Sequence, residues 1–149
     1  ARSPFLSLTL PALEGYRGTG EAPPQTPRQF SESLLPILRH ARTPFLCYSS
    51  YISIVEGYAE RVTAVRTGNA QADAFQGKVA AQLRQMAGVL TQMAEQARVR
   101  EEIRFGRTAV PRGLQQKTYA EAGAEHRRLL GEFARMTAML PQTAAAARP

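Results

Sequence analysis

The chain has 149 residues, a net charge of +7 at neutral pH and an apolar content of 44%. This length is enough for one domain with a core of its own, and this apolar content excludes a wholly disordered chain. The single cysteine, Cys47, excludes an internal disulfide, and together with two histidines it supplies too few ligands for a usual structural zinc site.

Residues 1–30 are predicted to form an extended arm. Prolines interrupt each of its short apolar runs, and proline fixes φ and lacks a backbone donor, so neither a long helix nor a central strand fits here. The arm nevertheless has large apolar side chains, which a solvated tail lacks. Its candidate partner-binding residues are Phe5, Leu8, Leu10, Leu13 and Tyr16. We expect the arm to dock on the body of its own chain or on a neighbour, and its composition best suits a clamp that lies across neighbouring subunits.

A first short helix is predicted to begin at Ser31, which is a suitable N-cap ahead of several leucines. Pro36 either kinks this helix or delays its start. The second helix has clearer boundaries. Thr43 can cap it, Pro44 suits its first position, and Gly68 is expected to end it.

The second helix is apolar over a wide arc. Its main seam repeats at steps of three and four residues and comprises Phe45, Tyr48, Ile52, Val55, Ala59 and Val62. A second stripe of Tyr51, Ile54 and Tyr58 runs beside this seam. A helix with so wide an apolar face touches more than one neighbour. The three residues of the second stripe are therefore also candidate partner-binding residues.

The strongest periodicity lies in a third helix, from about residue 70 to residue 104 with Asn69 as its cap, and in a fourth that ends near residue 140. Both have an apolar seam at heptad spacing. The third helix contributes Val79, Leu83, Met86, Leu90, Met93 and Ala97, and the fourth contributes Tyr119, Ala122, His126, Leu129, Phe133, Met136 and Leu140. The short connection between them predicts an antiparallel hairpin, with the second helix in the groove between its arms.

One member of the fourth seam, His126, is polar. The neighbouring Arg127 and Arg128 disfavour its protonation. We expect a neutral imidazole that hydrogen-bonds a facing side chain or backbone group and fixes the register of the bundle. A contact with a partner subunit is the alternative. Metal or heme ligation lacks a second ligand, and no cofactor is predicted.

The connection between the third and fourth helices is strongly basic, and Arg100, Arg104 and Arg107 are its candidate partner-binding residues. Either these cations are solvated and suit the C-terminal dipole of a helix, or they contact an acidic protein surface or anionic lipid headgroups. RNA is the weaker third alternative, because RNA-binding surfaces interleave aromatic side chains and only Phe105 is available here. Glu101 and Glu102 are expected to form exposed pairs with arginines.

No catalytic motif is present in the sequence. It has neither a phosphate-binding glycine loop nor a His-Glu-x-x-His pair. Cys47 with His40 or His126 lacks a third group to orient a nucleophile and its base, so Cys47 is predicted to be a small buried side chain. No apolar run is long enough to span a membrane. We therefore expect a protein that is not an enzyme and has no transmembrane helix.

Together these features predict an all-α fold. A long antiparallel hairpin with a third packed helix forms a bundle over residues 31–140, between the N-terminal arm and an Ala-rich tail at 141–149. The expected function is that of a non-catalytic accessory subunit of a large assembly, which acts by protein–protein contacts.

Three features of the sequence suggest which assembly this is. An Ala-Arg-Ser start, a basic pI and long helices fit a processed mitochondrial protein on the matrix side of the inner membrane or peripheral to it. ATP synthase and the respiratory-chain complexes are the assemblies expected by association. The alternative is a basic nucleic-acid-associated protein, such as an accessory subunit of the mitochondrial ribosome.

Overall fold

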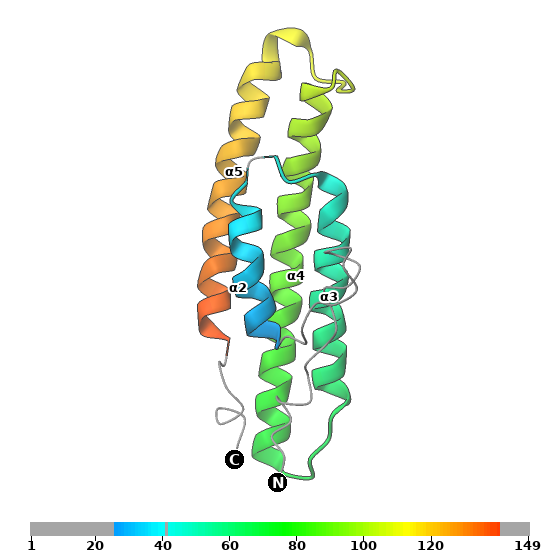
Figure 1. Cartoon of the computed structure of the whole chain (residues 1–149), viewed down its shortest axis with the longest axis vertical. Helices are drawn as coiled ribbons and strands as arrows, with labels where there is room; N and C mark the ends of the chain where they lie inside the picture. Colours follow the sequence, from blue (N-terminus) through cyan, green and yellow to red (C-terminus); the bar gives the residue numbers. More distant parts are fainter. Residues whose placement is uncertain (1–25, 41, 141–149) are drawn as a thin grey trace.

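The computed structural model of the protein describes residues 26–40 and 42–140, and its helices form an up-down-up-down bundle (Figure 1). The helices are α2 (Pro27–Leu38), α3 (Phe45–Ala64), α4 (Ala70–Arg104) and α5 (Arg112–Met139). The predicted all-α fold and the long antiparallel hairpin, formed by α4 and α5, are confirmed. Within the described ranges, no helix combines the length and the hydropathy needed to cross a membrane.

The first helix begins earlier than predicted, at Pro27 rather than after Ser31. Thr26 and Gln29 form a capping box. The backbone N–H of Gln29 donates to Thr26 Oγ1 at 3.2 Å, and the N–H of Thr26 donates to Gln29 Oε1 at 3.0 Å. Proline suits the first helical position because its missing N–H would have no partner there. Ser31 is buried inside the helix, and Pro36 also lies within it.

The second helix begins at Phe45, one residue after the predicted Pro44. The predicted cap, Thr43, hydrogen-bonds the preceding helix. Its Oγ1 donates to the carbonyl of Ile37 at 2.7 Å, so it closes α2 and does not cap α3. Helix α3 ends at Ala64, before the predicted Gly68, which lies in the following turn with a φ of 80°. The predicted cap of α4 is confirmed, because Asn69 Oδ1 accepts from the N–H of Ala72 at 3.0 Å.

Helix α4 is the central element of the bundle and packs along both α3 and α5. The seams of α4 and α5 supply much of the core, including the fully buried Leu83, Leu90 and Phe133. Helix α3 was predicted to lie in the groove between α4 and α5, but it packs mainly along α4, and the short helix α2 lies over the other side of the groove. Helix α2 lies between α3 and α5: it contacts α5, and the ring of its Phe30 lies 6.1 Å from that of Tyr58 in α3.

Candidate functional site

The α4–α5 hairpin extends beyond the start of α3 (Figure 1). The most exposed aromatic side chain among the described residues lies at this end of the bundle. Phe105 follows α4 directly and is 56% exposed. The guanidinium carbons of Arg104 and Arg107 lie 5.3 Å and 5.4 Å from the centre of its ring. Phe105 is thus flanked by two cations, which are attracted to the face of an aromatic ring.

The turn after α4 holds this arrangement in place. Gly106 has a φ of 69°, which favours glycine, and its N–H donates to the carbonyl of Ile103. The N–H of Arg107 donates to the carbonyl of Glu102 at 2.7 Å. These two bonds form a Schellman motif, which satisfies the last carbonyls of the helix. The motif turns the chain back so that Arg107 faces Phe105.

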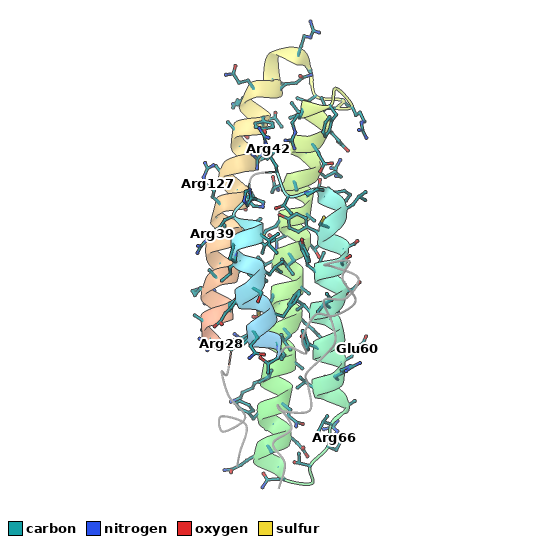
Figure 2. The ribbon with its side chains drawn as sticks, in the orientation of Figure 1. Arg28, Arg39, Arg42, Glu60, Arg66 and Arg127 are labelled. Atoms are coloured by element: carbon teal, nitrogen blue, oxygen red, sulfur yellow. The ribbon has the colours of Figure 1, made fainter. Side chains whose placement is uncertain are left out.

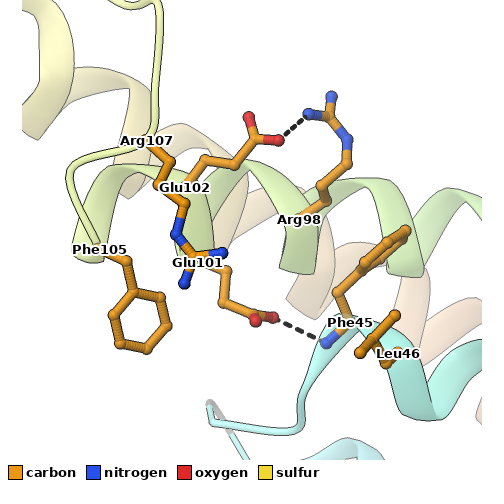
Figure 3. A pocket seen from close by; sticks show the side chains of 7 residues that line it. All are labelled: Phe45, Leu46, Arg98, Glu101, Glu102, Phe105 and Arg107. Atoms are coloured by element: carbon orange, nitrogen blue, oxygen red, sulfur yellow. Dashed lines mark hydrogen bonds and ion pairs between the residues drawn. The ribbon is translucent and has the colours of Figure 1, made fainter.

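A pocket of about 250 Å³ lies beside Phe105, where α4 meets the start of α3 (Figure 3). We call it the bundle-end pocket. Its lining residues are Phe45, Leu46, Arg98, Glu101, Glu102, Phe105 and Arg107. Leu46 is 77% exposed, so the pocket combines two exposed apolar side chains with charged groups of both signs.

Glu101 positions the start of α3 at this pocket. The N–H of Phe45 donates to Glu101 Oε2 at 2.8 Å, as Figure 3 shows. Pro44, the residue before the helix, makes no capping bond with its side chain, so the cap of α3 comes from α4. A carboxylate is favourable there because a helix N-terminus carries partial positive charge. Among the described residues Glu101 forms none of the ion pairs with arginine that were expected, whereas Glu102 does pair with Arg98 at 2.6 Å.

Replacing Glu101 with alanine is expected to lower the free energy of unfolding by about 0.5–2 kcal/mol, because the N–H of Phe45 loses its side-chain acceptor at the start of α3. Glu101→Gln keeps an acceptor and should cost less. Urea unfolding monitored by circular dichroism measures both values, with the exposed Glu60→Ala as the matched control. Equal stability of Glu101→Ala and Glu60→Ala would contradict a capping role.

The basic residues at this end fall into two groups. Arg98 pairs with both Glu95 and Glu102, so its charge is offset. Within the described ranges, Arg100, Arg104 and Arg107 form no ion pair. Arg104 and Arg107 flank the exposed Phe105, whereas Arg100 is half-buried over the ring of Tyr119, 5.0 Å from its centre. The structure therefore separates Arg100 from the other two predicted partner-binding arginines.

His126 lies in the core, where its Nε2 is 2.8 Å from the Tyr48 hydroxyl of α3. Burial lowers the pKa of His126, and the positive charges of Arg100 and Arg127 lower it further. Burial also raises the pKa of the Tyr48 hydroxyl well above its ordinary value. Both groups are therefore neutral at pH 7. The prediction that a neutral His126 bonds a facing side chain is confirmed.

The second stripe of α3 is not a partner-binding surface in this bundle. Tyr58 is fully buried and Tyr51 is 3% exposed, and both belong to the core. Ile54 is half-buried and packs against the same core. The sequence correctly indicated that α3 has more than one neighbour, but the additional neighbour is α2, which packs Phe30 against Tyr58.

The remaining predicted site residues are placed as follows. Phe5, Leu8, Leu10, Leu13 and Tyr16 lie outside the described residues. Cys47, predicted to be buried, is half-buried at the edge of the core. In the described part of the chain, no three His, Cys, Asp or Glu side chains gather as metal ligands.

No protein-family model, curated protein or solved structure matches this chain. The function of the bundle end is therefore inferred from its geometry alone. Sequence reasoning found its arginines but missed Leu46 and the capping role of Glu101. The glycine that follows Phe105 was a signal for its position, because a glycine of this kind commonly ends a helix and so puts Phe105 at the helix terminus.

Proposed function

We propose that this protein is a non-catalytic accessory subunit of a large assembly and that it binds a partner subunit through its bundle end. One observation supports this most directly. Phe105 is exposed between Arg104 and Arg107, which have no carboxylate partner among the described residues. An aromatic residue with arginines is the composition typical of binding hot spots.

The surroundings of Phe105 indicate the chemistry of the partner. Leu46 lies in the same pocket and is largely exposed, so an apolar side chain of a partner can cover both residues. The two arginines suit an acidic group beside that apolar side chain. We therefore propose a partner segment that combines acidic and apolar residues. On this chain, the common core of the bundle holds the helices that carry the binding residues in place.

The assembly we propose remains the one expected from the sequence, a mitochondrial inner-membrane energy-converting complex such as ATP synthase or a respiratory-chain complex. The basic charge and long helices support it by association. Contact of the arginines with anionic lipid headgroups is compatible with that location. The N-terminal arm, whose apolar residues lie outside the described ranges, is proposed as a second contact with neighbouring subunits.

A basic nucleic-acid-associated protein is the second candidate, because arginines beside an exposed phenylalanine can bind phosphates and stack on a base. Digestion with ribonuclease separates the two functions. A protein held by RNA is released from its assembly by ribonuclease, whereas one held by protein contacts stays bound.

The triple variant Arg104→Gln, Phe105→Ala and Arg107→Gln is expected to dissociate from the assembly and to remain folded. Surface substitutions change stability by roughly 0.5 kcal/mol each, whereas a binding hot spot contributes about 2 kcal/mol or more. Native electrophoresis of tagged full-length chain from mitochondria, at low and high salt, measures incorporation. Arg61→Gln with Arg66→Gln is the matched control, because Arg61 and Arg66 are exposed and Arg66 lies at the opposite end (Figure 2). Normal incorporation of the triple variant would refute the proposed bundle-end contact.

A further inference from the structure

The connection between α4 and α5 carries charge of one sign only. We call residues 103–120 the hairpin tip. Its charged residues are Arg104, Arg107, Arg112 and Lys117, and it contains neither Asp nor Glu. Within the described ranges, Lys117 pairs with Glu121 at 3.9 Å, whereas the three arginines form no ion pair. The hairpin tip is therefore a local concentration of positive charge that no carboxylate of the described residues offsets.

The same segment exposes an apolar side chain that the bundle-end contact does not use. Leu114 lies in the first turn of α5 and is 51% exposed. It does not line the bundle-end pocket, and neither does Arg112, two residues before it. In Figure 1 the start of α5 stands at the end of the molecule, beyond α2 and α3. An exposed leucine and an unpaired arginine therefore lie together at a protruding end.

Hydrogen bonds within the hairpin tip fix its conformation. The N–H of Leu114 donates to the carbonyl of Pro111 at 2.8 Å. The side-chain amide of Gln115 donates to the carbonyl of Val110 at 3.0 Å, and the N–H of Val110 donates to Thr108 Oγ1 at 3.1 Å. Because these bonds already order the turn, binding through it needs little further ordering of the chain.

We propose that the hairpin tip docks on an anionic lipid surface, with Leu114 in the headgroup region of the bilayer and Arg112 against the lipid phosphates. The boundary of a bilayer buries apolar side chains, and anionic headgroups attract cations beside them. A protruding end can reach a flat surface before the other helices meet it. The lack of carboxylates in the hairpin tip favours this partner, because an acid there would be repelled by the surface.

Nucleic acid fits the hairpin tip less well. RNA-binding surfaces stack bases on exposed aromatic rings. The aromatic residues of the tip are Phe105 and Tyr119, and Tyr119 is half-buried with the guanidinium of Arg100 over its ring, 5.0 Å from the centre. The lipid contact also stands apart from the proposed partner subunit, because Arg112 and Leu114 lie outside the bundle-end pocket. Either contact can fail without the other.

The first test uses tryptophan as a reporter, because the chain contains none. Full-length Leu114→Trp is mixed with vesicles of phosphatidylcholine containing phosphatidylglycerol. Its fluorescence is expected to shift to shorter wavelength and to be quenched by brominated lipids, since the ring leaves water for the headgroup region. Met139→Trp is the matched control, because Met139 is 62% exposed at the other end of α5. Its fluorescence should stay unchanged.

The second test measures affinity by sedimentation with the same vesicles. Arg112→Gln is expected to weaken binding about fivefold and Leu114→Ser about tenfold, and added salt should weaken binding of the unmodified chain. Arg135→Gln and Met139→Ser are the matched controls, because they remove the same groups from exposed positions near the other end of α5. Circular dichroism verifies that all four variants keep the helical signal.

These outcomes decide the proposal. It is overturned if the fluorescence of Leu114→Trp does not change with anionic vesicles, or if Met139→Trp shifts equally. It is also overturned if vesicles of phosphatidylcholine alone bind as tightly, or if Arg112→Gln and Leu114→Ser bind as tightly as their controls. A shift of Leu114→Trp with single-stranded RNA or polyglutamate but not with vesicles would assign the hairpin tip to a nucleic acid or an acidic protein, and would likewise overturn the lipid contact.

Discussion

Leu90→Asp is expected to unfold the bundle or leave it barely stable. Leu90 is fully buried in α4, the helix that packs along both α3 and α5. The substitution removes an apolar side chain from the core and places an ionisable carboxyl group where the core offers it no cationic partner. We expect the free energy of unfolding to fall by about 5 kcal/mol or more, which is comparable to the whole stability of many domains.

Circular dichroism of the full-length chain measures this effect through the helical signal at 25 °C and the melting temperature. Leu129→Asp, at a buried position of the facing seam, should behave in the same way. Leu46→Asp is the matched control, because Leu46 is 77% exposed and its replacement should change stability by only about 0.5 kcal/mol. If Leu90→Asp keeps the helical signal and melting temperature of Leu46→Asp, the α4–α5 seam is not the core.

The long hairpin could be predicted from the sequence because its determinants are local. The heptad spacing of Leu83, Leu90 and Met93 in α4 corresponds to one buried face of a helix. Asn69 before this helix and Gly106 after it are residues with defined capping geometries, and both behave as their chemistry requires. Such patterns need no information about the neighbouring helices.

The features that the sequence did not reveal depend on tertiary contacts. Tyr58 would face a partner if Phe30 of α2 did not pack against it, and nothing in the stripe itself indicates which chain supplies this contact. The start of α2 was also hidden, because Thr26 and Pro27 follow a proline-rich segment that favours an extended interpretation. A capping box between Thr26 and Gln29 was the available signal.

The candidate sites show the same division. The clustering of arginines near the end of α4 is visible as composition, so Arg104 and Arg107 were found. The capping of α3 by Glu101 requires that α4 pass the start of α3, and the approach of Arg100 to Gly123 requires that Arg100 reach across from α4 to α5. Both are contacts between helices, which the spacing of residues within a single helix cannot show.

The buried pair of Tyr48 and His126 makes stability depend on pH in a predictable direction. The folded state lowers the pKa of His126, so the folded chain binds fewer protons than the unfolded chain. The contribution of His126 to the free energy of unfolding is therefore fully present above the pKa of an unfolded histidine, about 6.5. It is lost as the pH falls below this value, by up to about 1.4 kcal/mol per pH unit. The carboxylates with lowered pKa values, Asp73, Glu95 and Glu125, contribute only at lower pH, where unfolded carboxylates titrate.

His126→Leu is accordingly expected to have two effects. At pH 8 it leaves the buried Tyr48 hydroxyl without its hydrogen-bond partner and costs about 1–3 kcal/mol, most of which the double variant with Tyr48→Phe should recover because no polar group then remains. Between pH 6.5 and pH 5 it should abolish the loss of stability seen in the wild type. Urea unfolding across this range measures both effects, with the exposed His40→Gln as a control that keeps the wild-type slope. A His126→Leu variant with the wild-type slope would show that another group titrates, and a double variant no more stable than His126→Leu would show that the hydrogen bond to Tyr48 is not what the imidazole contributes.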